Sequence, residues 1–374
     1  MKTISILGTV GIPASYGGFE TLAENLVRFH LENNLPGQLV VYCSAKSYIE
    51  KLQFFHGAIL RYIRLNANGV ASITYDIVSL LSAVRHRSNV ILLLGVSGAI
   101  ALPIVRFFSK ALIVTNIDGI EWKRQKWKGL ARWFLRLSER FAVKYSHVVI
   151  ADNGGIATHV AETYGKHCYV IAYGGDHAVT ATLKPYSGTP LPERYALALC
   201  RIEPENNVDM ILSAFALHPT IPLVFVGNWN NSTYGQDLRL RYAEHANLYL
   251  LDPIYDVGIL RTLRDNANIY VHGHSAGGTN PSLVEMMHFG VPILAYDCIF
   301  NRCTTEDKAG FFKDVESLRK AMEILDTGVA VQIGADMRRI AQDRYTWDAV
   351  GHSYFELLLG KKLEPKSVPK LYNH

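Results

Sequence analysis

Short apolar runs alternate with amphipathic segments along nearly the whole chain. A short apolar run predicts a buried strand, and apolar residues spaced three and four positions apart predict a helix. In the first half, strands are predicted at residues 3–8, 39–43, 59–63, 90–94, 112–115 and 148–151. Helical patterns fall between them, including residues 19–31, 73–84 and 130–145. This alternation predicts an α/β fold with a parallel sheet covered by helices on both faces.

The rhythm breaks at residues 172–192, where six glycines and prolines gather: Gly174, Gly175, Pro185, Gly188, Pro190 and Pro192. Strands are then predicted at residues 195–200, 223–226, 248–250, 269–271 and 293–295. We therefore expect two Rossmann-like, doubly wound domains, at residues 1–175 and 176–345, with a helix near 346–360 packing back on the first. Ligands of such folds bind at the carboxyl ends of the strands, so the chemistry is expected in a cleft between the domains.

Composition narrows the class of protein. A length of 374 residues suits two domains, and 49% hydrophobic with 19% charged residues is typical of a soluble globular protein. Five cysteines without a CxxC pair favour reduced thiols over a disulfide framework or a zinc site. The N-terminal apolar run is too short for a secretory signal, and glycine and proline interrupt residues 90–108, so we expect a cytoplasmic protein without a membrane span.

Charge is divided unevenly along the chain. Residues 1–170 carry 19 Lys+Arg against 10 Asp+Glu, whereas the remainder carries 19 against 23. The first half is therefore expected to face an anionic partner. Its basic residues concentrate at 123–144, where aromatic residues are interleaved with cations at helical spacing. That pattern suits an anionic membrane surface or a lipid diphosphate, although a solvated helix face would look the same and nucleic acid is a third option.

Three loops follow predicted strands and carry residues suited to binding. Residues 8–20, GTVGIPASYGGFE, lack both the GxGxxG fingerprint and a Walker lysine, yet their glycines let backbone N–H groups approach a phosphate or sugar. A flexible turn is the alternative. Arg201 ends a strand in the segment RIEPENN, and GTNPSLVE at residues 278–285 begins a helix before Gly290-Val291-Pro292.

In this order the three segments resemble glycosyltransferase family 4, which has the GT-B fold. GTVGIPASYGGFE and residues 116–124, NIDGIEWKR, are more narrowly similar to a bacterial rhamnosyltransferase-like branch that builds surface polysaccharides such as capsule and O-antigen. The resemblance implies a retaining enzyme that moves a sugar from a nucleotide-diphosphate donor, with dTDP-L-rhamnose favoured, onto a polyprenyl-diphosphate-linked saccharide. It implies no cofactor, and the absence of an Asp-x-Asp motif predicts no metal.

The resemblance also implies which side chains act. Arg201 would hold the leaving diphosphate, Glu285 would accept hydrogen bonds from the ribose diol, and Asp118 would orient a hydroxyl, with an Asx turn as its alternative. The helix start at 279–282 would offer free N–H groups to the diphosphate. The donor site is predicted to comprise Gly17, Gly18, Arg201, Asn206, Gly278, Thr279, Asn280, Ser282 and Glu285. The acceptor or membrane side is predicted to comprise Glu20, Lys123, Arg124, Trp127, Arg132 and Arg136.

Two positions depart from the family pattern. Asn206 stands where a lysine is usual, and Gly277 stands where the first of two paired glutamates would fall. His272 and His274 are spaced like two metal ligands but lack carboxylate or cysteine company, so we expect them to order the loop instead. A sugar-nucleotide epimerase and a non-catalytic nucleotide-sugar-binding protein remain the alternative functions.

Overall fold

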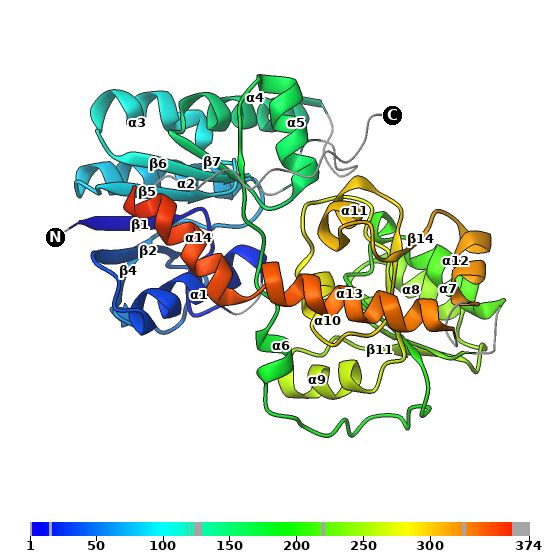
Figure 1. Cartoon of the computed structure of the whole chain (residues 1–374). Coiled ribbons are helices and arrows are strands. Elements are labelled where there is room, and N and C mark those ends of the chain that lie inside the picture. Colours follow the sequence, from blue (N-terminus) through cyan, green and yellow to red (C-terminus); the bar gives the residue numbers. More distant parts are fainter. Residues whose placement is uncertain are drawn as a thin grey trace. The chain divides into compact units, whose positions relative to one another are not determined.

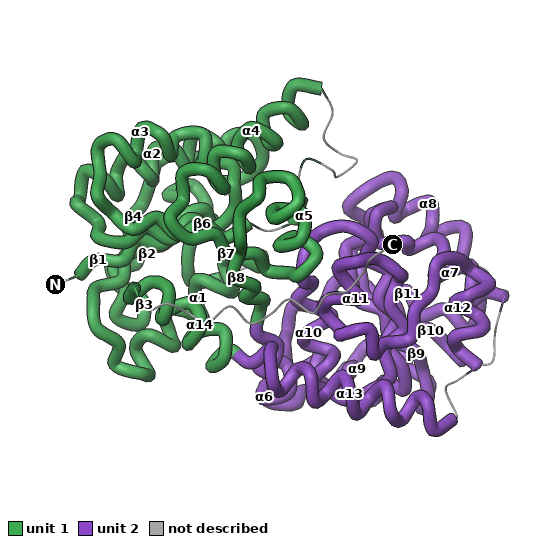
Figure 2. Tube along the Cα trace, turned by 45° about the horizontal axis from the view of Figure 1, so that its top comes forward, with its two compact units in different colours: residues 1–173, 347–374 green, residues 174–346 purple. Residues whose placement is uncertain are grey.

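The computed structural model describes residues 2–14, 17–117, 119–120, 122, 129–217, 221–323 and 327–360 (Figure 1). The chain divides into two compact units, which Figure 2 shows in green and purple. Unit 1 comprises residues 1–173 and 347–374, and unit 2 comprises residues 174–346. The change of unit at 173/174 falls two residues before the boundary expected from the sequence.

Unit 1 is built on an eight-stranded sheet in the order β3-β4-β2-β1-β5-β6-β7-β8. All neighbours are parallel except β3 with β4. The strands are β1 Thr3–Leu7, β2 Gln38–Ser44, β3 Phe54–Phe55, β4 Ala58–Ile63, β5 Val90–Leu94, β6 Leu112–Ile117, β7 Val148–Ala151 and β8 Tyr169–Val170. The helices are α1 Gly18–Glu32, α2 Ala71–Arg85, the 3₁₀ turn η1 Ala99–Ala101, α3 Leu102–Phe108, α4 Gly129–Tyr145, α5 Gly154–Tyr164 and α14 Trp347–Leu359.

The strand order of unit 1 reverses at β1, which pairs with β2 on one side and with β5 on the other. Because all three strands are parallel, the loops that follow β1 and β5 leave the same edge of the sheet and diverge. This is the topological switch point at which open α/β sheets bind ligands.

Unit 2 repeats the architecture with a six-stranded parallel sheet in the order β11-β10-β9-β12-β13-β14. Its strands are β9 Ala196–Leu199, β10 Leu223–Val226, β11 Leu248–Leu251, β12 Ile269–His272, β13 Ile293–Tyr296 and β14 Gly310–Phe312. Its helices are α6 His177–Thr180, α7 Val208–Ala216, α8 Thr233–Arg241, α9 Val257–Asp265, α10 Pro281–Met287, α11 Ile299–Thr305, α12 Val315–Met322 and α13 Gly328–Arg344, with 3₁₀ turns η3 Pro204–Asn206 and η4 Trp229–Asn231. Its switch point lies between β9 and β12.

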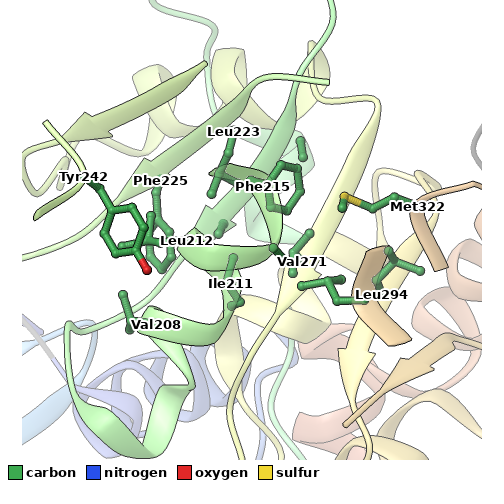
Figure 3. Packing of buried hydrophobic residues seen from close by; sticks show 14 of the residues in the cluster. Val208, Ile211, Leu212, Phe215, Leu223, Phe225, Tyr242, Val271, Leu294 and Met322 are labelled. Atoms are coloured by element: carbon green, nitrogen blue, oxygen red, sulfur yellow. The ribbon is translucent and has the colours of Figure 1, made fainter. Parts of the chain in front are cut away.

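The core of unit 2 shows why α7 forms where it does. Val208, Ile211, Leu212 and Phe215 follow the helical period and form one apolar stripe, and all four side chains are buried. The stripe packs in the same cluster as Leu223 and Phe225 of β10 and Val271 of β12 (Figure 3). Burying four side chains of this size contributes on the order of 6–12 kcal/mol before chain entropy is subtracted.

The C-terminal helix α14 belongs to unit 1 (Figure 1). Phe355 stacks on Phe29 of α1 with ring centroids 5.8 Å apart, and Asn116 Nδ2 donates to the Tyr354 hydroxyl at 2.5 Å. The chain therefore returns to its first unit after completing the second. Among the described residues, no helix combines the length and apolar character needed to cross a membrane.

We predict that Gly351→Val loosens the attachment of α14. A Cβ atom at Gly351 would lie 2.4 Å from Phe29 Cγ, and the Phe29 ring is held by Phe355 and by an edge contact with His352. The free energy of unfolding of unit 1 should fall by about 1–3 kcal/mol, because the helix must move outward. Thermal melts check this against Gly328→Val, where a Cβ meets nothing within 4 Å. Equal Tm values for the two variants would contradict the packing.

Candidate functional site

Glu20, on the first turn of α1, holds the loop after β1 through hydrogen bonds. Glu20 Oε1 accepts hydrogen bonds from Thr9 Oγ1 at 2.9 Å and from the Val10 N–H at 2.7 Å. Gly17 has φ +126°, and a Cβ there would lie 1.9 Å from Glu20 Oε2, so glycine is required at this approach. Gly18 begins α1 beside the Tyr173 ring.

Glu20 is only 8% exposed, and its carboxylate holds this loop within unit 1. Its predicted place on the acceptor side stays a prediction. The predicted residues Asp118, Lys123, Arg124 and Trp127 lie outside the described residues.

Arg201 directly follows β9 at the switch point of unit 2. Its guanidinium is about half exposed, and Nη1 lies 3.6 Å from Glu203 Oε1. A long exposed ion pair of this kind is worth little, so the Arg201 charge is available to a ligand at small cost.

Asn206 has a role that the sequence did not reveal. Its side chain is 3% exposed, and Nδ2 donates to the Arg201 carbonyl at 2.7 Å. The next residue, Asn207, donates to the Gly273 carbonyl at 2.8 Å, and Ser275 Oγ donates to the Glu205 carbonyl at 2.7 Å. These bonds join the loop after β9 to the loop after β12. Asn206 therefore positions the backbone at Arg201, and its predicted contact with the donor stays a prediction.

The start of α10 is capped by its own residues. Asn280 Oδ1 accepts from the Ser282 N–H at 3.0 Å and from Ser282 Oγ at 2.8 Å, and Pro281 has no N–H. The free donors expected here are thus reduced, because the cap takes the Ser282 N–H. Contacts to a diphosphate from Gly278 and Thr279, in the preceding loop, stay a prediction.

Gly277 leaves open space where the family pattern has a glutamate. It has φ +114°, and a Cβ built there meets no atom within 4 Å. The backbone conformation therefore favours glycine, although the surrounding space would accommodate a larger side chain.

Glu285 is the centre of a charged group within unit 2. Arg264 of α9, with a side chain 4% exposed, donates through Nη2 to Glu285 Oε2. His177 Nε2 of α6 lies 3.3 Å from the other carboxylate oxygen, Oε1. Burial acts to raise the pKa of Glu285, but the Arg264 charge and the His177 hydrogen bond outweigh it and hold that pKa below its ordinary value.

This geometry fixes the Glu285 carboxylate as an anion in one orientation. Each oxygen keeps accepting capacity, since an ionised carboxylate accepts about four hydrogen bonds. It can therefore bind a vicinal diol without losing its own support. Arg264 and His177 were not found from the sequence, because neither stands in a motif.

The other residues predicted from the sequence lie outside the group formed by Glu285, Arg264 and His177. His272 and His274 stack with ring centroids 4.4 Å apart at 13°, and burial holds the pKa of His272 well below its usual range. Within the described ranges, no three His, Cys, Asp or Glu side chains gather closely enough to hold a metal. Arg132 and Arg136 lie on α4, where Arg136 sits over the Trp122 ring at 5.4 Å.

Two protein families match the chain, and the boundary between them falls close to the boundary between the two units. Residues 1–176 match a domain of unknown function (DUF1972), and residues 180–327 match the family described as glycosyl transferases group 1. A search of curated proteins found no match.

Solved structures similar to this chain span almost its full length. Sucrose-phosphate synthase from Thermosynechococcus elongatus shares 14% identity at a TM-score of 0.77, covering 96% of this chain and 98% of that one. Anabaena HepE, in complex with UDP and glucose, shares 15% at 0.67, covering 96% and 99%. A Rickettsia africae glycosyltransferase shares 12% at 0.69, covering 96% and 99%. These likenesses confirm the GT-B fold with two Rossmann-like domains.

We predict that Arg264→Met destabilises unit 2. Removing one partner of a buried pair leaves the other charge without compensation, so the free energy of unfolding should fall by about 2–4 kcal/mol near pH 7. Wild-type stabilisation by Glu285 is present above its unfolded pKa and is lost as the pH falls through its lowered folded pKa. The difference between the proteins should therefore shrink as the pH falls below about 4.5.

The matched control is the double variant Arg264→Met/Glu285→Gln, which leaves no unpaired charge and should recover part of the loss. Calorimetry across this pH range checks both variants. A double variant less stable than Arg264→Met alone would contradict the pairing.

Proposed function

We propose that this chain, which carries a glycosyltransferase group 1 domain behind a DUF1972 domain, moves a sugar from a nucleotide-diphosphate donor to an acceptor. The observation that carries the proposal is Glu285, held ionised and oriented by Arg264 and His177. It follows β12, and Arg201 follows the neighbouring strand β9. At one switch point the Glu285 carboxylate can accept hydrogen bonds from a diol, and Arg201 supplies a cation. These two groups suit the ribose and the diphosphate of a nucleotide sugar.

The catalytic contribution of this site would be electrostatic. Cleavage of the sugar–phosphate bond places negative charge on the departing diphosphate, and Arg201 would stabilise that charge as it develops. In a retaining transfer the departing diphosphate oxygen would take the proton of the acceptor hydroxyl, so no enzyme base is required. Asp118 is proposed to orient a hydroxyl, and Gly17, Gly18, Gly278, Thr279 and Asn280 to line the donor.

The donor and acceptor follow from the sequence resemblance. We propose dTDP-L-rhamnose as donor and a polyprenyl-diphosphate-linked saccharide as acceptor, without a metal or cofactor, in surface polysaccharide synthesis at the cytoplasmic face of the membrane. Two strongly similar segments, at residues 8–20 and 116–124, support the rhamnosyltransferase-like branch.

A membrane-facing surface is proposed on α3 and α4, which pack against each other in unit 1. Phe107 is 83% exposed, Leu130 is 85% exposed, and large apolar side chains are also exposed at Ile104, Phe108 and Trp133. The same two helices and the residues beside them carry exposed cations: Arg106, Lys110, Arg132, Arg136, Arg140 and Lys144. Exposed aromatic residues beside cations favour an anionic lipid surface over a solvated helix face.

The transferase is tested with purified protein, EDTA and a panel of nucleotide sugars, with and without a polyprenyl-diphosphate saccharide. We expect acceptor-dependent release of nucleotide diphosphate and a product heavier by one sugar. Arg201→Ala should lower kcat by about 10²-fold or more, because one stabilising charge is lost. Arg241→Ala, an exposed arginine paired with Asp209 at 3.1 Å, is the matched control and should leave kcat unchanged.

Other outcomes of the assay would overturn the proposal. Conversion of donor without any acceptor would identify an epimerase. Donor binding without turnover on the acceptors supplied would identify a binding protein.

Membrane contact is tested by flotation with vesicles of phosphatidylglycerol and of phosphatidylcholine. We expect binding to the anionic vesicles alone, weakening with salt, and its loss in Phe107→Ser/Phe108→Ser. Val329→Ser/Val331→Ser replaces two exposed apolar residues of α13 in unit 2 and should bind as the wild type does. Equal flotation of both double variants would remove α3 from the proposed surface.

A further inference from the structure

A polar cavity of about 130 Å³ lies entirely within unit 1. Side chains that can hydrogen-bond form much of its wall: Thr9, Glu20, Asn68, Ser72, Asp76 and Ser97. Thr9 follows β1 and Ser97 follows β5, so the cavity opens at the switch point of the sheet. Its place in the fold is therefore that of a binding site.

Asp76 enters this cavity from the buried face of α2. It lies on the stripe that also contains Ser79, Leu80 and Ala83, and only 3% of it is exposed. Ser97 Oγ donates to Asp76 Oδ2. Gly98 permits this approach, because a Cβ there would lie 2.5 Å from Asp76 Cβ.

The described residues that line the cavity include no Lys, Arg or His, so no cation of this wall compensates the burial of Asp76. Burial accordingly raises the pKa of Asp76 to about 7, with the Ser97 hydrogen bond acting in the opposite direction. A buried carboxyl that lacks an ion pair costs stability, which is a common property of side chains kept for binding or catalysis.

The other polar groups of the wall are fixed by the fold. Glu20 Oε1 already accepts from Thr9 and Val10, and the Tyr75 hydroxyl donates to the Thr9 carbonyl at 3.1 Å. Ser97 engages one oxygen of Asp76, which leaves accepting capacity on a carboxyl that can take about four hydrogen bonds. Thr9, Glu20 and Tyr75 are thus held by the fold, whereas Asp76 keeps hydrogen-bonding capacity for a ligand.

The charge of the wall decides which ligand fits. Two acids without a cation repel a phosphate or diphosphate, so the anionic part of a lipid-linked substrate is excluded. Hydroxyl, amide and carboxyl groups match the vicinal hydroxyls of a sugar ring. We propose that this cavity binds a neutral sugar unit, and that Asp76 and Ser97 select its hydroxyls. The role of this sugar as the acceptor rests on the proposed transferase function, whereas its binding does not.

Binding is measured apart from turnover, by saturation-transfer NMR of the full chain with neutral monosaccharides and with inorganic pyrophosphate as the anionic probe. We expect at least one monosaccharide to bind, and Asp76→Asn and Ser97→Ala each to weaken it about 10- to 100-fold. Ser79→Ala is the matched control, because Ser79 lies one turn further along α2, is buried and does not line the cavity.

Three results would overturn the proposal: no monosaccharide binds, binding is unchanged in both cavity variants, or binding of pyrophosphate depends on Asp76. Failure of transferase turnover with sugar binding intact would refute the proposed function alone. Ser97→Ala keeps the test decisive if Asp76→Asn does not fold.

A stability measurement separates binding from a structural role. Because the pKa of Asp76 is raised to about 7, the native state retains a proton that the unfolded chain loses near pH 4, so stability falls as the pH rises between these values. The other titratable groups on the wall, Glu20 and Tyr75, are unchanged in the variant. Asp76→Asn should therefore raise the Tm more at pH 8 than at pH 5. A lower Tm at pH 8 would show that the carboxylate supports the fold, and would overturn its assignment to the ligand.

Discussion

Parallel pairing of neighbouring strands is the constraint from which the sites follow. It brings the loops after β1 and β5 together in unit 1, and the loops after β9 and β12 together in unit 2. Where the strand order reverses, the two loops diverge and leave space between them. Arg201 and Glu285 thus follow neighbouring strands although 83 positions separate them along the chain. Thr9 and Ser97 lie on one cavity for the same reason, and α2, the helix that precedes β5, brings Asp76 to them.

Each unit contains a buried carboxyl group, and the pKa values of the two groups are shifted in opposite directions. Arg264 and His177 surround Glu285 and lower its pKa, so that side chain stays ionised and its orientation is fixed. Asp76 accepts a hydrogen bond from the Ser97 hydroxyl, the described wall of its cavity holds no cation, and burial raises its pKa. In the proposed transferase, these ion pairs suit Glu285, because its carboxylate would have to stay ionised to accept hydrogen bonds from a neutral diol close to an anionic diphosphate. An uncompensated acid suits a site in which the ligand itself supplies the missing hydrogen bonds.

The fold could be predicted from the sequence because its strands are buried and strongly apolar. Residues 90–94, 148–151 and 223–226 have the predicted bounds, whereas β3, β8 and β14, of two or three residues each, are too short to give a periodic signal. The sequence also placed Arg201 after a strand and Glu285 on the first turns of a helix, as the structure has them. Arg264 could not be, since only tertiary packing brings it to Glu285. Asp76 could have been found: it is the sole acid between Glu50 and Asp118 and stands on the apolar stripe of a predicted helix.

Two positions depart from the pattern of the family that the sequence resembles, and their effects on charge cancel. By that resemblance Asn206 stands in place of a cation and Gly277 in place of an anion, so together they would leave the net charge around a donor unchanged. Asn206 closes the Arg201 loop through its amide, and Gly277 takes a conformation that glycine favours and leaves space in front of it. In the proposed transferase, attraction of the diphosphate would then depend mainly on Arg201, whose backbone carbonyl accepts a hydrogen bond from Asn206. In the proposed transferase, both positions would therefore act through the shape of their loops, and neither of them would carry a charge.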